Sequence, residues 1–152
     1  MKKKKDTFSC KRAEKKDINI FFEWANDPEV RKSAFKTNKI SWSEHKNWYY
    51  KKIQSKKVSL FIIKKNKISI GQVRLEKKKN FINISYSLSK KFRGFGLGKK
   101  LLSIALKKIK KKTNIVLVGK VKKKNIKSVN VFKSLGFKGI IKNKVYYFKK
   151  NI

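Results

Sequence analysis

The chain contains little cysteine, proline, histidine or acid, and it has no long apolar run. One cysteine in 152 residues, Cys10, excludes a disulfide framework and a cysteine-rich zinc site. No segment approaches the roughly 20 apolar residues of a membrane-spanning helix. The lysines that follow Met1 also precede no apolar stretch of the kind that a signal peptide requires. We therefore predict a cytoplasmic protein with no metal site and no membrane partner.

Acidic residues are so scarce that the formal net charge is +37, with 45 lysines and arginines against eight aspartates and glutamates. Clustered positive charge is typical of nucleic-acid-binding proteins, because each neutralised phosphate releases counterions. Only four of the basic residues are arginine, the side chain that reads guanine edges and phosphates through paired hydrogen bonds. Lysine, isoleucine and asparagine are abundant together, as AT-rich codons would produce, and the lysine runs recur along the whole chain. We therefore attribute the charge to codon usage and a solvated surface rather than to a nucleic-acid partner.

The length fits one domain over residues 1–152, with the lysine-rich residues 1–5 as a candidate disordered start. Apolar spacing predicts the element order β, α, α, β, β, β, α, β, α, β, β, which is a mixed α/β sheet. In the N-terminal part, Asp17 and either Ser41 or Ser43 are the expected caps of two amphipathic helices, and residues 26–29 read as a helix stop followed by a new start. Strands are expected over 7–12, 58–63, 68–75, 80–88, 115–118, 139–141 and 145–148, and the two later helices begin after residue 98 and at residue 126.

The most informative segment is a glycine-rich turn between an expected strand and an expected helix. Residues 93–98 read Arg-Gly-Phe-Gly-Leu-Gly. Such a turn exposes backbone N–H groups at the positive end of a helix, and glycine lets a phosphate approach the backbone closely. The spacing matches neither a dinucleotide-binding fingerprint nor a P-loop. The alternative is a tight strand-to-helix turn in which the glycines are needed only for steric reasons and bind no phosphate.

Two motifs together resemble those of the GNAT N-acetyltransferases. The segment 86–102, centred on Arg93-Gly94-Phe95-Gly96-Leu97-Gly98, is similar to the family's acetyl-CoA motif Q/R-x-x-G-x-G/A. The segment from Asn125 to Phe137 is similar to the family's Asn-x-x-Ala/Ser helix that ends in Gly-Phe. The pair occurs in the family's order and at its interval, and the likeness covers about residues 58–148. It implies a GNAT-like mixed central sheet flanked by helices, with a splayed strand pair at the acetyl-CoA site.

By this resemblance the protein is an N-acetyltransferase that transfers acetyl directly from acetyl-CoA to an amine. The amides of residues 94–99 would hold the pyrophosphate, and residues 86–88 would pair with the pantetheine through their backbone. An N–H near Leu88 would polarise the thioester carbonyl, and Asn125 would lie beside the cofactor arm. The implied cofactor-binding set is Tyr86, Ser87, Leu88, Arg93, Gly94, Phe95, Gly96, Leu97, Gly98, Lys99 and Asn125.

The chain departs from the family at the general acid and base. Phe132 stands where many members have a tyrosine that protonates the leaving thiolate, and Lys120 stands where enzymes that acetylate protein N-termini often keep a glutamate. Tyr146 and Tyr147 are alternative acids, and a thiolate can also leave without one. Both roles stay open.

The N-terminal third, residues 17–55, shapes the acceptor site in this family. The stretches Trp24–Arg31 and Glu44–Trp48 resemble the subgroup that acetylates a UDP-linked 4-amino-4,6-dideoxy sugar in pseudaminic-acid synthesis. We therefore expect a UDP-amino sugar as acceptor, with tryptophans stacking on it, an arginine pairing with its phosphate, and His45 as a candidate base because its ordinary pKa is near neutrality. The expected substrate-binding set is Trp24, Asn26, Arg31, His45 and Trp48.

Several alternatives stay open at this point. Trp24 and Trp48 could be core residues, and His45 could lie on a helix surface. The acceptor could instead be a protein N-terminus or another small amine, and the chain could be a basic nucleic-acid-binding module on a degenerate fold. The exact acceptor and the oligomeric state, monomer or dimer, are not determined by the sequence.

Overall fold

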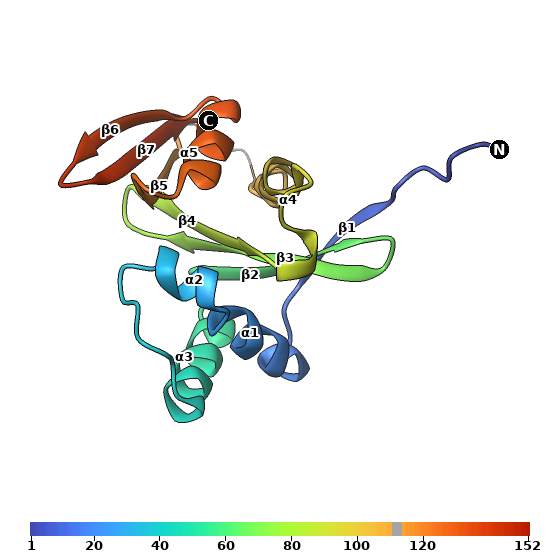
Figure 1. The fold of residues 1–152 in the computed structure, drawn as a ribbon. Coiled ribbons are helices and arrows are strands. Elements are labelled where there is room, and N and C mark those ends of the chain that lie inside the picture. Colours follow the sequence, from blue (N-terminus) through green and yellow to red (C-terminus); the bar gives the residue numbers. More distant parts are fainter. Residues whose placement is uncertain (111–113) are drawn as a thin grey trace.

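Seven strands form one sheet with helices on both faces, as the computed structural model of the chain shows (Figure 1). The structure describes residues 1–110 and 114–152. The strand order is β1-β2-β3-β4-β5-β7-β6, and every neighbouring pair is antiparallel except β4 with β5. The predicted mixed α/β sheet is therefore confirmed. The strands are β1 (Phe8–Arg12), β2 (Val58–Lys65), β3 (Ile68–Lys77), β4 (Phe81–Leu88), β5 (Val116–Lys122), β6 (Lys138–Lys142) and β7 (Val145–Asn151).

The helices are α1 (Ile18–Ala25), α2 (Pro28–Ser33), α3 (Trp42–Gln54), α4 (Leu97–Leu106) and α5 (Ile126–Ser134), with short 3-10 turns at η1 (Lys15–Asp17) and η2 (Lys90–Phe92). The predicted order was wrong at one place, because three helices precede β2 where two were expected. The extra helix, α2, has six residues and buries none of them, so it left no apolar periodicity to detect. Asp27 and Pro28 marked its start in the sequence, as a cap residue followed by a proline of the first turn. In the structure Asp27 accepts hydrogen bonds from the N–H groups of Glu29 and Val30 at 3.1 and 3.3 Å.

Each face of the sheet carries its own apolar core. Helices α4 and α5 cover one face, where Leu101, Leu102 and Phe132 pack on the sheet, and α1 and α3 cover the other, where Phe21 and Tyr49 pack (Figure 1). Successive side chains of each strand point to opposite faces of the sheet, so the strands contribute apolar side chains to both cores, as expected for a sheet covered on two sides. The N-terminal helices and the glycine-rich turn are thus held on one rigid support.

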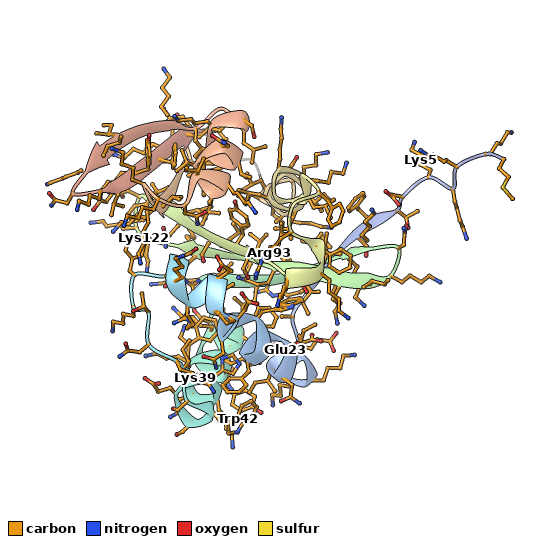
Figure 2. The ribbon with its side chains drawn as sticks, in the orientation of Figure 1. Lys5, Glu23, Lys39, Trp42, Arg93 and Lys122 are labelled. Atoms are coloured by element: carbon orange, nitrogen blue, oxygen red, sulfur yellow. The ribbon has the colours of Figure 1, made fainter. Side chains whose placement is uncertain are left out.

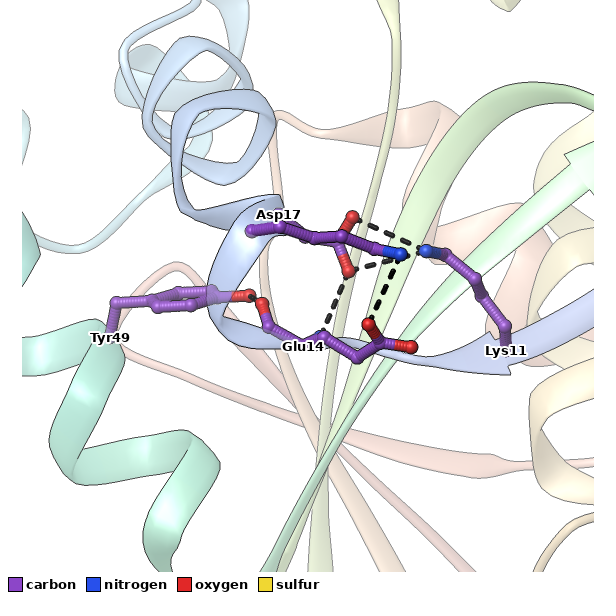
Figure 3. A network of polar contacts seen from close by, with 5 residues as sticks. Lys11, Glu14, Asp17 and Tyr49 are labelled. Atoms are coloured by element: carbon purple, nitrogen blue, oxygen red, sulfur yellow. Dashed lines mark hydrogen bonds and ion pairs between the residues drawn. The ribbon is translucent and has the colours of Figure 1, made fainter.

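A polar network fixes the start of α1 against α3 (Figure 3). The Tyr49 hydroxyl donates to the Glu14 carbonyl at 2.6 Å, and the Lys11 ammonium lies 3.3 Å from the Asp17 carboxylate. Asp17 stands at the predicted N-cap position of α1, but its carboxylate accepts from the Glu14 N–H at 2.9 Å instead of from the helix. Burial raises the pKa of Tyr49, so its hydroxyl stays protonated and keeps this bond.

The sheet opens between β4 and β5. The two strands pair only from Phe81 to Ile84 and from Val116 to Gly119, although β4 continues to Leu88 and β5 to Lys122. At the last pair, a ring carbon of Phe132 lies 2.5 Å from where a Gly119 Cβ would be, so only glycine lets the α5 side chain enter there. The strands separate beyond this point, which confirms the splayed strand pair.

The chain start lies apart from this body. Residues 1–5 carry no regular structure and extend away from the sheet before β1, where Figures 1 and 2 show the N-terminus and Lys5. Of the helices in the described residues, none has both the length and the apolar content needed to cross a membrane.

Candidate active site

A cleft of about 1840 Å³ follows the opening between β4 and β5. On one side it reaches Trp48 and the segment after α2, and on the other it reaches Asn125 and Ser128 at the start of α5. Leu88 and Arg93, at the end of β4 and in the following turn, also line it. The cleft therefore connects the N-terminal helices with the region of the glycine-rich turn.

The turn before α4 is an open cradle of backbone donors. Gly94 and Gly96 have positive φ angles of 83° and 69°, and a Cβ placed on either would meet no atom within 4 Å. Gly96 is the N-cap of α4, and no acidic residue occupies the first turn of that helix. The first N–H groups of a helix have no partner within it. Together with the helix dipole, these residues fit a pyrophosphate group that approaches the backbone closely.

Arg93 braces this region instead of pointing into solvent (Figure 2). Its Nε and Nη2 donate to the Leu88 carbonyl at 3.1 and 2.9 Å, and its Nη1 pairs with Asp27 Oδ1 at 2.9 Å. The two side chains are only 22% and 15% exposed. Arg93 therefore joins the end of β4 to the N-terminus of α2. The sequence contained both partners, but their separation of more than 60 positions gave no signal of the pair.

The other side chains expected at the cofactor lie where the strands separate. The Tyr86 hydroxyl donates to Ser128 Oγ at 3.0 Å across the gap between β4 and α5, and Ser87 Oγ accepts from Gln72 Nε2 at 3.1 Å. Asn125 is the N-cap of α5, where its Oδ1 accepts from the Ser128 N–H at 3.3 Å. Burial raises the pKa of Tyr86, so this hydroxyl stays protonated.

The structure separates the alternative acids from the cleft. Phe132 is buried, with its ring stacked on Phe148 at a centroid distance of 5.1 Å. The Tyr146 ring also stacks on Phe148, at a centroid distance of 5.2 Å, and neither Tyr146 nor Tyr147 is among the lining residues of the cleft. Tyr86 and Ser128, whose hydroxyls are hydrogen-bonded to each other, do line the cleft, and nothing in the sequence indicated that bond.

The acceptor-side residues divide into those that face the cleft and those that support it. Asn26 binds both backbone groups of Ile40, through Nδ2 to the carbonyl at 2.9 Å and Oδ1 from the N–H at 2.8 Å, and it does not line the cleft. Arg31 lines the cleft but donates to the carbonyls of Ala25, Lys36 and Asn38 at 2.6, 3.0 and 3.4 Å. Asn26 and Arg31 therefore fasten the segment between α2 and α3.

The two tryptophans differ in their surroundings. Trp24 is 7% exposed and packs against Phe21, with ring centroids 5.9 Å apart. Trp48 is half-buried at the cleft, and the Arg74 guanidinium lies over its ring at 5.4 Å from the centroid. Both tryptophans line the cleft. Trp24 is also a core residue, as the core alternative describes, whereas Trp48 is less buried.

His45 is buried at 2% exposure, so the alternative of a helix-surface position is wrong. Its Nε2 lies 3.0 Å from the Ile18 carbonyl, which can only accept, and the proton therefore resides on Nε2. Burial lowers the pKa of the ring, with the bond to Ile18 opposing that shift. His45 is consequently neutral at pH 7, and its Nε2 is committed to holding α3 against α1.

This burial predicts a pH-dependent stability. The unfolded chain binds a proton at His45 near pH 6.5, while the folded chain resists it, so the free energy of unfolding should fall as the pH drops from about 6.5 to 5. Urea unfolding at four pH values in this window would measure the slope. His45→Gln should flatten it, and an equal slope in the variant would contradict the assignment. The acidic groups with lowered pKa, Asp6 and Glu76, contribute only at lower pH.

The comparisons with known proteins agree with this geometry. Residues 11–138 match the acetyltransferase (GNAT) domain family. A domain from Methanocaldococcus jannaschii superposes with a TM-score of 0.84 at 19% identity, covering 97% of this chain and 100% of that one. Spermidine N-acetyltransferase from Vibrio cholerae, solved with CoA and spermine, gives 0.81 at 17% identity and 95% coverage of both chains. An aminoglycoside acetyltransferase solved with coenzyme A gives 0.78 at 13% identity, again with 95% of both chains covered. The search of curated proteins found no match.

Proposed function

Because the chain belongs to the GNAT acetyltransferase family and is an N-acetyltransferase that uses acetyl-CoA, we propose that its acceptor is an amine on an anionic molecule, specifically a nucleotide-linked amino sugar. The observation that carries this proposal is the charge of the cleft. Among the residues that the structure describes, two carboxylates line it, Glu29 and Glu44. The basic lining residues number eleven: Arg31, Lys32, Lys36, Lys39, Arg74, Lys78, Arg93, Lys120, Lys122, Lys124 and Lys127.

This charge disfavours the acceptors named for two of the similar structures. Spermine and aminoglycosides are polycations, which a cleft with this excess of lysine and arginine repels. Of the two carboxylates, Glu44 is already engaged in the cap of α3, where its Oε2 lies 3.3 Å from the Ser41 N–H. An acceptor with phosphate groups is instead attracted, and its rate of association rises at low salt.

The positive charge of the cleft also offers a way to deprotonate the acceptor amine without a general base. An amine must lose its proton before it can attack a thioester, and surrounding positive charge lowers the pKa of an ammonium group. Lys120 and Lys122 line the cleft beside the opening of the sheet. An acceptor amine held near them is deprotonated more readily, without a dedicated carboxylate or histidine.

The remaining roles fall to groups already described. Bound acetyl-CoA supplies an activated acyl group. The backbone N–H groups of residues 94–99 would hold the pyrophosphate. Residues 85–88 of β4, which pair with β3 but not with β5, would offer their free backbone groups to the pantetheine. The Tyr86 hydroxyl, kept protonated by burial and bonded to Ser128, is the donor available to a departing thiolate.

The proposal is tested by binding and by turnover. Calorimetric titrations with acetyl-CoA and, separately, with UDP should both give saturable binding. In an acetyl-transfer assay, a UDP-linked 4-amino-4,6-dideoxy sugar should be acetylated in preference to spermidine, kanamycin or an N-terminal peptide, with a rate that declines as salt rises. Preferred turnover of spermidine or kanamycin would refute the anionic acceptor, and preferred turnover of the peptide would favour the N-terminal alternative.

A matched pair of variants separates cleft charge from overall charge. Lys122→Gln removes a charge from the cleft lining, whereas Lys16→Gln removes one from η1, where the side chain is 70% exposed and outside the cleft. Lys122→Gln should raise the acceptor KM severalfold, and Lys16→Gln should leave it unchanged. Equal effects would mean that the cleft has no special role.

A further inference from the structure

Three of the four arginines are committed to backbone carbonyls, and Arg74 is not. Arg12 donates to the Val58 carbonyl at 3.0 Å, Arg31 to three carbonyls of the segment around α2, and Arg93 to that of Leu88. Arg74 makes no hydrogen bond to another described residue, and its Nε is buried without a partner among them. A buried donor left without a partner costs stability. Arg74 also lines the cleft, and its two Nη groups have no hydrogen-bond partner among the described residues, so they are available to a ligand there.

The carboxylate nearest to Arg74 does not balance its charge. Glu76 Oε2 lies 4.0 Å from Arg74 Nε, beyond hydrogen-bond distance. The other oxygen of Glu76 is bound by Lys52 at 3.1 Å and by Lys78 at 2.7 Å. Three cations thus surround one carboxylate, and a net positive charge remains at this point of the cleft.

Arg74 is also held in place for recognition. It lies on β3 opposite Ser85 of β4, on the same face of the sheet as Gln72 and the Ser87 hydroxyl that Gln72 binds. Its guanidinium lies over the Trp48 ring, with Cζ 5.4 Å from the ring centroid, and this cation–π contact uses none of its N–H donors. Burial lowers the pKa of Arg74, but a guanidinium stays charged at neutral pH.

We propose that Arg74, seated on Trp48, is a specificity-determining anion subsite that binds an oxyanion of the acceptor, a phosphate or a carboxylate, through paired N–H donors. This inference rests on the proposed function, since it identifies the group that reads the acceptor's negative charge. A guanidinium matches such groups bidentately, which gives direction as well as attraction. The phosphate of a nucleotide-linked sugar has this chemistry.

The low arginine count makes a direct test feasible. A ¹⁵N spectrum of the arginine Nε groups contains four signals, and Arg74→Lys identifies the one from Arg74. Titration with inorganic pyrophosphate, and separately with succinate, should shift the Arg74 signal saturably while the Arg12 signal stays in place. A response to pyrophosphate identifies a phosphate subsite, and a response to succinate alone identifies a carboxylate subsite. If the Arg74 signal moves with neither anion, or only in parallel with Arg12, the proposal is overturned.

Steady-state kinetics with the acceptor that the enzyme acetylates provide a second readout. Arg74→Gln should raise the acceptor KM about tenfold to a hundredfold, as expected for the loss of a charge-assisted bond pair, while the KM for acetyl-CoA changes less than about twofold. Arg74→Lys should recover part of the loss, and Arg12→Gln should have no effect on the acceptor KM. A change shared equally by both substrates would indicate a structural role only. The spectra need no acceptor turnover, so failure of the nucleotide-sugar assignment remains distinguishable from failure of the subsite.

Discussion

Replacing Gly96 by valine is expected to abolish acetyl-CoA binding while leaving the chain folded. The residue has a φ of 69° at the N-cap of α4, and a β-branched side chain there is strained by about 1–2 kcal/mol. The surrounding space is open, so the fold can accommodate the new atoms. They would, however, occupy the cradle that the phosphates must enter. Calorimetry should show acetyl-CoA affinity reduced by at least about a hundredfold, the loss of two charge-assisted hydrogen bonds.

A variant at a second glycine with a positive φ angle distinguishes loss of the phosphate site from the effect of backbone strain. Gly136 has a φ of 83° after α5, far along the chain from the turn, and only the Lys150 side chain lies within 4 Å of a Cβ placed there. Gly136→Val should therefore lower the melting temperature to a similar extent as Gly96→Val but keep full affinity for acetyl-CoA. If both variants bind acetyl-CoA as the wild type does, the glycine-rich turn is not the phosphate site.

Removing the Arg93 side chain should produce the second large effect, on stability and activity together. Arg93→Met deletes two hydrogen bonds to the Leu88 carbonyl and leaves the Asp27 carboxylate, which is 15% exposed, without its cation. Breaking one side of a mostly buried pair costs about 3 kcal/mol. Urea unfolding should show this loss, and kcat/KM should fall because the ends of β4 and α2 lose their connection.

A double-mutant cycle tests whether the pair acts as a unit. Asp27→Asn keeps an oxygen that can cap α2 but removes the charge, so the Arg93→Met and Asp27→Asn effects should fall short of additive by at least about 1 kcal/mol. Arg12→Met is the control, since Arg12 donates to one carbonyl. Strict additivity of the Arg93 and Asp27 variants would show that the bridge contributes little.

The parts of the fold that the sequence predicted were those with strong periodicity or punctuation. The alternation over residues 80–88 gave β4, and the Ser41 cap with Glu44 three residues later gave the start of α3. Helix α2 escaped because a six-residue helix with no buried face has no apolar repeat. The splay was implied only by the family resemblance, because the point where β4 and β5 stop pairing is a relation between two strands that lie far apart in the sequence.

The site was predictable where it is local and not where it is assembled from distant segments. The turn at residues 93–98 is one continuous motif, and its glycines have the expected positive φ angles at Gly94 and Gly96. The commitment of Arg31 and Arg93 to backbone carbonyls could not be read from residue type, since an arginine beside a phosphate and one beside a carbonyl look alike in sequence. The roles of individual site residues, the cytoplasmic location and the domain limits stay predictions.

The separation of β4 from β5 gives the sheet an edge in its interior. Residues 85–88 of β4 face β5 without the hydrogen bonds that continue the ladder below Ile84. An ordinary edge strand on the outside of a protein invites pairing with other chains. Here the free edge lies inside the sheet, with helices on both faces of that sheet (Figure 1), and its residues line the cleft, through which a ligand reaches them. Any extended ligand that lies along this edge takes the place of a neighbouring strand by pairing with its free backbone groups. Binding of such a ligand to the folded state then raises the free energy of unfolding by mass action, so the enzyme is most stable when its ligand is bound.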